Sequence, residues 1–380
     1  MSAATRGRLK LAVVRQRYNP YGGAERFIAR ALPALERAGA EIALIARSEA
    51  GWGVRRIILV NPFHVGRLWR DWSFAHAAKK AWRKEPFDLI QSHERIPGCD
   101  VYRAGDGVHR RWLELRRASA GPLDRLGIAL NPYHYYVRAA EKRMFEHAGL
   151  RAVICNSRMV RDEIGQAFRV APEKLHVIYN GVDLEHFDAR ARNFLRGPAR
   201  AELGCRPHEA LFLFVGSGFS RKGLDTAIDA LALAGDPALR LAVVGRDRDD
   251  ARYVAQARRR AIGERVRFLG GREDVRPLYA AADCFILPTR YDPFPNTALE
   301  ALAMGLPAIV SSRCGAAEVI EEGSNGWICR PDDVAGIAAL MRHAATAVRG
   351  PDMEHAARST AERFGIDAMA AQLAELYASL

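Results

Sequence analysis

The chain has no apolar run long enough to cross a membrane, and its cysteines form no paired motif. A membrane-spanning helix needs about 20 consecutive apolar residues, so the sequence argues against an integral membrane protein. The six cysteines are scattered without a C-x-x-C pair, which argues against a disulfide framework and a zinc site. With 380 residues and no internal repeat, the sequence predicts two or three globular domains.

The first ten residues lack the apolar core of a signal peptide. They are basic and mostly small, and the apolar stretch after them, residues 11–14, is too short for such a core and fits a strand instead. We therefore expect a cytoplasmic protein whose cysteines are reduced.

The net charge of +13 is unevenly placed along the chain. Residues 1–185 carry the whole positive excess, and residues 186–380 are balanced. This asymmetry points to an anionic partner of the first half, either a membrane surface, an anionic glycolipid or nucleic acid. Residues 108–145 interleave arginine with tryptophan and tyrosine, which suits a bilayer interface or single-stranded nucleic acid. An ordinary domain helix with arginine outside and tyrosine inside is the alternative.

Short apolar runs alternate with helical patterns in both halves. This alternation predicts an α/β protein with parallel sheets covered on both faces. The expected strands are residues 11–14, 41–46, 88–93 and 152–156, then 211–216, 241–245, 266–269, 284–287, 308–311 and 327–329. The expected helices are residues 25–38, 223–234, 251–262, 275–281, 297–304 and 367–380.

The domain boundaries follow from this alternation. We predict one domain over residues 1–185, a second over 186–365, and a last amphipathic helix over 366–380. A charged segment, residues 188–207, is interpreted as the linker after a hinge. Parallel sheets bind ligands beyond the carboxyl ends of their strands, so the loops that follow strands are the candidate sites.

The most informative loop is Y-D-P-F-P-N-T-A-L-E-A-L-A-M-G-L-P, residues 291–307. It follows an expected strand, and two prolines hold it open before a helix that Asn296 or Thr297 is predicted to cap. The first amides of that helix, from Asn296, Thr297, Ala298 and Leu299, form a candidate anion seat. Asp292 precedes Glu300 by eight residues, so we expect one acid to bind sugar hydroxyls and the other to bind ribose hydroxyls. A proline-rich turn feeding a buried helix is the alternative.

Two glycine-containing loops also follow expected strands. G-S-G-F-S-R-K-G, residues 216–223, combines small residues with Arg221 and Lys222, which suits a diphosphate, although it lacks the G-K-[ST] of a P-loop. Y-N-P-Y-G-G-A-E, residues 18–25, places Gly22 and Gly23 before a helix, which suits a phosphate, although it is no G-x-G-x-x-G motif. Plain turns are the alternative for both loops.

Single acidic residues extend this set. Asp106 follows an extended segment, where its carboxylate is expected to bind hydroxyls, and we favour it over His109 nearby. The triplet Asp247-Arg248-Asp249 looks like a metal-binding D-x-D, but flanking arginines disfavour a divalent ion. We interpret it as a charged loop and expect no metal.

With these residues in view, the chain resembles the family 4 retaining glycosyltransferases of the two-domain GT-B fold, and within them the lipopolysaccharide core glucosyltransferase I group. The resemblance covers nearly the whole chain. It rests on Y-N-P-Y-G-G-A-E-R, P-G-C-D-V-Y-R-A-G-D, N-G-V-D, G-S-G-F-S-R-K-G, G-R-E-D-V-R-P-L-Y-A-A-A-D and residues 291–307.

The resemblance implies two Rossmann-like domains facing across a cleft, with the final helix crossing back to the first domain. It also implies a UDP-sugar donor and no cofactor or metal. Gly22 and Gly23 would approach the donor, Arg221 and Lys222 would neutralise the leaving diphosphate, and Arg272 would lie at the base pocket. Glu300 would hold the ribose, and Asp106 would be the acid of the cleft. The family has Glu where this chain has Asp292, which affects reach to the sugar.

The expected activity is the transfer of a hexose, with glucose favoured, to a lipid-linked acceptor such as the lipopolysaccharide core, with the anomeric configuration kept. The basic first domain would dock on the anionic cytoplasmic face of the inner membrane. A UDP-sugar epimerase of similar fold is the rival enzyme. A basic nucleic-acid-binding protein is the rival from another class, but no recognised motif supports it and we expect no nucleic acid partner.

Overall fold

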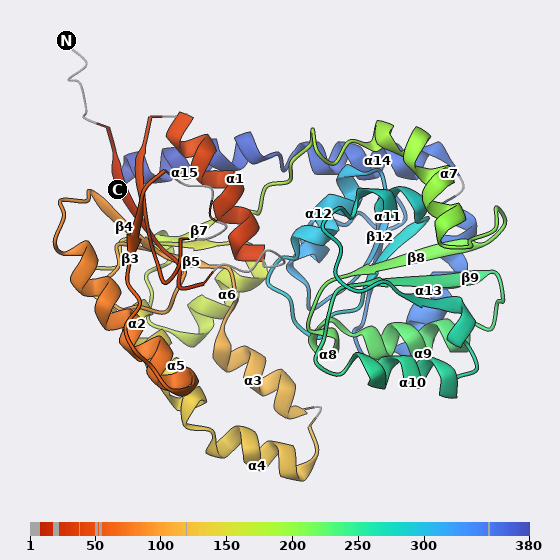
Figure 1. Ribbon diagram of the computed structural model, residues 1–380, viewed down its shortest axis with the longest axis horizontal. Helices are drawn as coiled ribbons and strands as arrows, with labels where there is room; N and C mark the ends of the chain where they lie inside the picture. The colour runs from red at the N-terminus through yellow and green to blue at the C-terminus, as the bar shows by residue number, and fades with distance from the viewer. Residues whose placement is uncertain are drawn as a thin grey trace. The chain divides into compact units, whose positions relative to one another are not determined.

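Two parallel sheets organise the chain, one in each of its two units (Figure 1). The computed structural model describes residues 8–17, 23–37, 39–49, 52, 55–118, 120–348 and 350–380. One unit contains the chain up to Asn180 together with Ile366–Leu380, and the other contains Gly181–Gly365. Among the described helices, none combines the length and apolarity that a bilayer crossing requires.

The first unit carries a seven-stranded sheet of order β3-β2-β1-β4-β5-β6-β7, in which every neighbouring pair is parallel. The strands are β1 (Lys10–Val14), β2 (Glu41–Ala46), β3 (Ile57–Leu59), β4 (Leu89–Ser92), β5 (Val101–Ala104), β6 (Ala152–Cys155) and β7 (Leu175–Val177). The helices are α1 (Gly23–Arg37), α2 (Gly66–Trp82), α3 (His109–Ala118), α4 (Pro122–Leu130), α5 (Pro132–Phe145), α6 (Arg158–Ala167) and α15 (Ile366–Ser379), with a short η1 (Pro172–Lys174).

Two hydrophobic cores cover the two faces of this sheet. Alternate residues of β1 separate them, because successive side chains of a strand point to opposite faces. Leu11 and Val13 join a core with α1 and α15, whereas Ala12 and Val14 join a core with α2, α5 and α6. Helix α15 contributes Met369, Leu373, Leu376 and Tyr377. The C-terminal helix therefore belongs to the first unit, as predicted.

The second unit carries a six-stranded parallel sheet of order β10-β9-β8-β11-β12-β13. Its strands are β8 (Ala210–Val215), β9 (Leu239–Val244), β10 (Val266–Phe268), β11 (Cys284–Leu287), β12 (Ala308–Ser311) and β13 (Gly326–Cys329). The α-helices are α7 (Arg192–Glu202), α8 (Phe219–Lys222), α9 (Leu224–Ala234), α10 (Asp250–Arg259), α11 (Arg276–Ala281), α12 (Asn296–Ala303), α13 (Val334–Ala347) and α14 (Pro351–Glu362). Short 3₁₀ turns are η2 (Ala189–Ala191), η3 (Gly263–Arg265) and η4 (Gly315–Val319).

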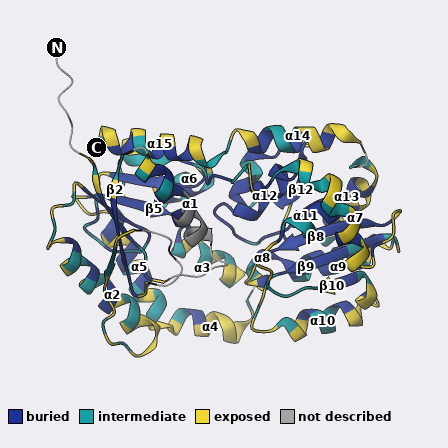
Figure 2. Cartoon of the chain, turned by 45° about the horizontal axis from the view of Figure 1, so that its top comes forward, coloured by how far each residue is buried: buried dark blue, intermediate teal, exposed yellow. Residues whose placement is uncertain are grey.

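The strand order reverses direction once in each sheet. The reversal lies between β1 and β4 in the first sheet and between β8 and β11 in the second. In open parallel sheets a ligand binds at this point, beyond the carboxyl ends of the two strands. The loops after these four strands therefore carry the candidate sites. In both units most strands are buried and the helices expose their outer faces (Figure 2).

The segment interpreted as a linker is folded, and that interpretation is wrong. Residues 192–202 form α7, whose Arg196 and Arg200 donate to the carbonyl oxygens that end α11 and pair with Asp283. The arginines of this segment therefore donate to buried acceptors. The segment is a packed helix and not a solvated linker. The sequence pattern also missed β7, which overlaps the start of the expected hinge at His176 and Val177.

Replacement of Arg200 by methionine is expected to destabilise the second unit. Arg200 is buried, and its guanidinium also donates to the carbonyl oxygens of Arg206 and Glu209 at 2.8 and 2.7 Å. Removing one partner of a buried charged network costs roughly 3 kcal/mol of unfolding free energy, which chemical denaturation measures. Arg190→Met, on an exposed pair with Asp188, is the matched control, and equal stability of both variants would contradict the assignment.

Candidate active site

One carboxylate joins the loops after β8 and β11. Asp292 Oδ2 accepts hydrogen bonds from Arg221 Nη1 at 3.0 Å and from Lys222 Nζ at 3.1 Å. Arg221 Nη1 also donates to the carbonyl oxygen of Tyr291 at 2.9 Å. The two cations follow β8 and the acid follows β11, so the cluster lies at the point where the strand order of the second sheet reverses. The structure thus brings together three of the residues predicted from separate motifs.

This cluster is largely shielded from solvent. Asp292 is 6% exposed and Lys222 is 8% exposed. Burial alone would raise the pKa of Asp292, but Lys222 and Arg221 outweigh it and hold the pKa below its ordinary value. The side chain of Arg221 remains about one-third exposed, at 36%. The cluster therefore holds an ionised acid at neutral pH and leaves a guanidinium within reach of a ligand.

Two glycines allow the loop after β8 to pack closely. A Cβ on Gly216 would lie 2.5 Å from Lys222 Cδ, and a Cβ on Gly223 would lie 2.0 Å from the carbonyl oxygen of Pro288. Both glycines have positive φ, +151° and +76°, which disfavours any other residue. Gly216 therefore lets the aliphatic part of Lys222 pack against the loop, and Gly223 lets the backbone at Pro288 do the same.

Residues outside the loop fix its backbone. Asp247 Oδ2 accepts from the amide of Phe219 at 2.7 Å, and the amide of Arg290 donates to the carbonyl oxygen of Arg221 at 2.8 Å. Arg290 in turn forms a two-point pair with Asp225, at 3.0 and 2.7 Å. Asp247, from the D-x-D-like triplet, thus orients the loop that carries the two cations.

Helix α12 begins differently from the prediction. Its N-cap is Pro295, Asn296 is the first helical residue, and no side chain caps the helix. The prediction that Asn296 or Thr297 caps it is therefore wrong, because the proline already fixes the extended conformation that a cap residue needs. Asn296, Thr297, Ala298 and Leu299 are all buried. The amide of Ala298 already donates to the carbonyl oxygen of Pro295 at 3.2 Å. The candidate anion seat is therefore reduced to the helix start before Ala298, where the first amides have no acceptor within the helix.

Glu300 is fully buried, at 0% exposure, and a tyrosine that the sequence reasoning missed holds it. Tyr279 Oη lies 3.2 Å from Glu300 Oε2 and 3.2 Å from the carbonyl oxygen of Thr297. Tyr279 comes from α11, within the R-P-L-Y-A-A-A-D motif. A buried tyrosine hydroxyl needs a hydrogen-bond partner. A tyrosine within a mostly apolar helix was therefore the signal by which the sequence could have indicated this contact. For Glu300 to touch a ribose, the residues that cover it must give way.

The described contacts of this cluster include none of the remaining predicted donor residues. Arg272 is exposed in the loop between β10 and α11, and forms no ion pair within the part of the chain that the structure describes. Gly22 lies outside the described residues, and Gly23 is the first residue of α1. Their predicted roles therefore stay predictions.

Asp106 belongs to a polar pocket of about 320 Å³ within the first unit. Arg15 Nη1 lies 4.0 Å from Asp106 Oδ2 and 3.4 Å from Glu94 Oε1. The three residues follow β1, β4 and β5, so they meet at the carboxyl edge of the first sheet. Burial raises the pKa of Glu94, although Arg15 opposes it. Arg15 and Glu94 were missed, although each follows an expected strand.

His109, the weaker sequence candidate, has a structural environment. Its ring nitrogen Nε2 lies 3.1 Å from His134 Nδ1, and its amide donates to Glu141 Oε1 at 2.8 Å. Burial and the nearby Arg95 lower the pKa of His109 to about 3. His109 is therefore neutral at physiological pH and joins the starts of α3 and α5.

Comparison with known families and structures agrees with this architecture. The family model described as Glycosyltransferase Family 4 matches residues 21–186, and the model described as Glycosyl transferases group 1 matches residues 196–364. The first of these models spans β2 to β7 of the first sheet, and the second spans all the strands of the second sheet. The chain is a glycosyltransferase of the GT-B fold, and it belongs to glycosyltransferase family 4.

Individual relatives span most of the chain. It is 26% identical over 339 residues to the lipopolysaccharide glucosyltransferase WaaG of Escherichia coli, covering 87% of this chain and 88% of that one. The crystal structure of WaaG superposes with a TM-score of 0.82 at 23% identity, over 97% and 99% of the two chains. A UDP-glucose complex of Anabaena HepE gives 0.74 at 22% identity, over 98% and 100%. Glycogen synthase of Mycobacterium tuberculosis is 28% identical over 300 residues, 76% of this chain and 64% of that one.

Replacement of Tyr279 by phenylalanine is expected to raise KM for the nucleotide-sugar about fivefold and to change kcat little. The variant keeps the ring packed on Phe187 and Phe285 and removes only the hydroxyl next to Glu300, a loss of about 1 kcal/mol. Because Glu300 is predicted to hold the ribose, the preference for a ribose over a 2′-deoxyribose donor should also fall. Steady-state kinetics with both donors checks this, and an unchanged preference would leave Tyr279 a purely structural residue.

Proposed function

We propose that the protein transfers a hexose from a UDP-sugar to a hydroxyl of a lipid-linked acceptor, with the anomeric configuration kept and glucose as the favoured sugar. The observation that carries the proposal is the Arg221–Lys222–Asp292 cluster at the reversal point of the second sheet. The activities of relatives support it, since WaaG is a glucosyltransferase and HepE was solved with UDP-glucose.

The chemistry of the cluster suits departure of a nucleoside diphosphate. Negative charge develops on the diphosphate as the sugar leaves, and positive groups fixed in advance stabilise it without reorganisation. Asp292 uses one N–H of Arg221 and one of Lys222, and the carbonyl oxygen of Tyr291 uses a second N–H of Arg221, whereas a guanidinium has five and an ammonium three. The remaining donors and the first amides of α12 would bind the phosphates, so the proposed reaction needs no metal.

The proposed acceptor side lies in the first unit. Asp106, Glu94 and Arg15 form a polar pocket at the carboxyl edge of the first sheet, and carboxylates there would orient an acceptor hydroxyl. The hydroxyl would attack the anomeric carbon, and the departing phosphate oxygen would take its proton. WaaG acts in lipopolysaccharide biosynthesis, and a lipopolysaccharide core is accordingly the acceptor that we propose.

Arg221→Ala and Lys222→Ala are each expected to lower turnover by about 10²–10³-fold, the typical cost of removing a group that stabilises developing charge. Release of the nucleoside diphosphate, UDP from UDP-glucose or UDP-galactose and GDP from GDP-mannose, is measured with acceptor and with EDTA and gives both the effect and the donor preference. Arg259→Ala on the exposed face of α10 is the control. Wild-type turnover in both site variants, or loss of activity in EDTA, would sink the mechanism; sugar conversion without acceptor would favour an epimerase.

An exposed apolar face in the first unit supports binding to a membrane. Helix α4 exposes Leu123, Leu126 and Leu130 at 85%, 56% and 69%, which lie on one side of the helix. Phe63, Trp69 and Trp72 near the start of α2 are also exposed, and arginines of α3 lie on the helix before α4. Apolar and aromatic side chains beside arginine suit an anionic bilayer interface, so we propose the cytoplasmic face of the inner membrane as the location.

Leu123→Ser combined with Leu126→Ser is expected to weaken binding to phosphatidylglycerol vesicles by at least tenfold, because burying a leucine side chain is worth about 1.5–3 kcal/mol. Added salt should also weaken the binding of the wild-type protein to these vesicles. Leu233→Ser, at an equally exposed leucine of α9 in the second unit, is the control. Co-sedimentation measures both, and equal binding by all three proteins would refute the docking face.

A further inference from the structure

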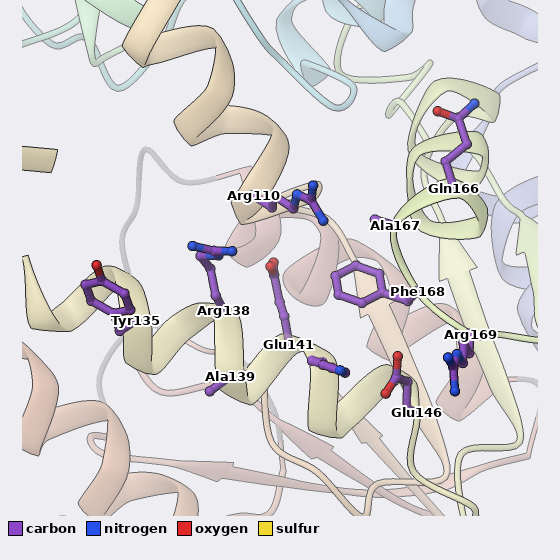
Figure 3. A pocket seen from close by; sticks show the side chains of 11 residues that line it. Arg110, Tyr135, Arg138, Ala139, Glu141, Glu146, Gln166, Ala167, Phe168 and Arg169 are labelled. Atoms are coloured by element: carbon purple, nitrogen blue, oxygen red, sulfur yellow. The ribbon is translucent and has the colours of Figure 1, made fainter. Parts of the chain in front are cut away.

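A second groove in the first unit shares no lining residue with the pocket of Asp106, although both lie along α5. It has a volume of about 670 Å³ and lies along α5, between the start of α3 and the end of α6. Arg110, Arg138 and Arg169 line it together with the aromatic residues Tyr135 and Phe168 (Figure 3). Neither the donor cluster nor the proposed acceptor pocket uses these side chains.

The groove contains more cationic than acidic side chains. Arg138 and Lys142 are exposed on α5, four residues apart, where like charges repel. Arg138, Lys142 and Arg169 form no ion pair with any residue that the structure describes, and Arg110 pairs only with Glu114 of its own helix. Arg110 of α3 and Arg138 of α5 both line the groove (Figure 3). An anion bound among these cations would relieve the repulsion between Arg138 and Lys142.

The floor of the groove carries a buried acceptor. Glu141 is 1% exposed, and its Oε1 accepts from Arg95 Nε and from the amide of His109, both at 2.8 Å. Its Oε2 has no hydrogen-bond partner among the described residues. Buried polar atoms are almost always partnered in native proteins. This oxygen therefore calls for a donor such as a ligand hydroxyl.

A smaller extension of about 150 Å³ continues the groove along α3. It shares Arg110 and Arg138 and adds Arg117, whose buried Nε also lacks a partner among the described residues. Against these cations, the groove and its extension contain Glu114, Glu141 and Glu146, of which the first two already bind arginine. The chemistry of the whole groove is that of an anion site with one hydroxyl acceptor.

We propose that this groove binds the phosphate ester of a hydroxylated compound. The phosphate would lie between Arg110 and Arg138, where guanidinium groups can donate in pairs to its oxygens. A neighbouring hydroxyl would donate to Glu141, and the carbon skeleton would lie against Phe168. Both a soluble phosphorylated sugar or glycerol and an anionic phospholipid headgroup carry this chemistry.

Titration with glycerol 3-phosphate and co-sedimentation with vesicles test the groove and separate the two sources. Arg138→Gln combined with Lys142→Gln removes two exposed charges, and Arg258→Gln combined with Arg259→Gln on α10 is the matched control. The groove variant is expected to bind glycerol 3-phosphate at least tenfold more weakly than the wild-type protein and the control. Loss confined to phosphatidylglycerol vesicles, relative to phosphatidylcholine vesicles, supports the headgroup as the source.

Two results would overturn the site. One is equal binding of both probes by the wild-type protein and the groove variant. The other is equal weakening in the groove variant and the control, which would show an effect of net charge alone. UDP binding, measured in parallel, should be unchanged in both variants, so failure of the groove is distinguishable from failure of the proposed donor site.

Discussion

The ion cluster of Asp292 with Arg221 and Lys222 is the constraint on which the rest of the proposed site depends. It joins two loops that are about 70 residues apart and follow adjacent strands. Two cations held close together in a buried position repel each other unless an acid lies between them, and the acid is costly to bury without them. Each charge is therefore tolerable only in the presence of the others. The result is a pair of cations fixed before any ligand arrives, which is what stabilisation of a leaving diphosphate requires.

The fold was predictable where a short strand is wholly apolar. Strands β1, β2, β8 and β11 are buried along almost their whole length, so their sequences are distinctive. By contrast, β3 and β7 are three-residue edge strands that are only partly buried, and nothing in their sequences separates them from loops. Helix α7 was missed for another reason. Its arginines bind backbone carbonyls of α11, and such a partner is visible only once the chain has folded.

The motifs identified loops that follow strands but could not give the contacts of their residues. The role of Asp292 toward a sugar stays a prediction, and the structure adds that Asp292 pairs with the cations of another loop. The link between Tyr279 and Glu300 joins α11 to α12 across two strand connections, and no spacing rule predicts it. Arg15 and Glu94 were within reach of the sequence reasoning. Each lies directly after a strand beside the reversal point, and strand order alone would have selected them.

The uneven charge of the chain has a structural explanation. In the second unit, arginines form ion pairs with acidic residues of the same unit, such as Arg200 with Asp283 and Arg290 with Asp225. In the first unit, Arg138 and Lys142 have no such acid among the described residues and lie on one helix face beside a groove. Cations that stabilise a fold are paired, whereas cations kept unpaired and close together cost free energy in the absence of a ligand. Arg138 and Lys142 of α5 are therefore the part of this excess charge for which we propose a bound anion.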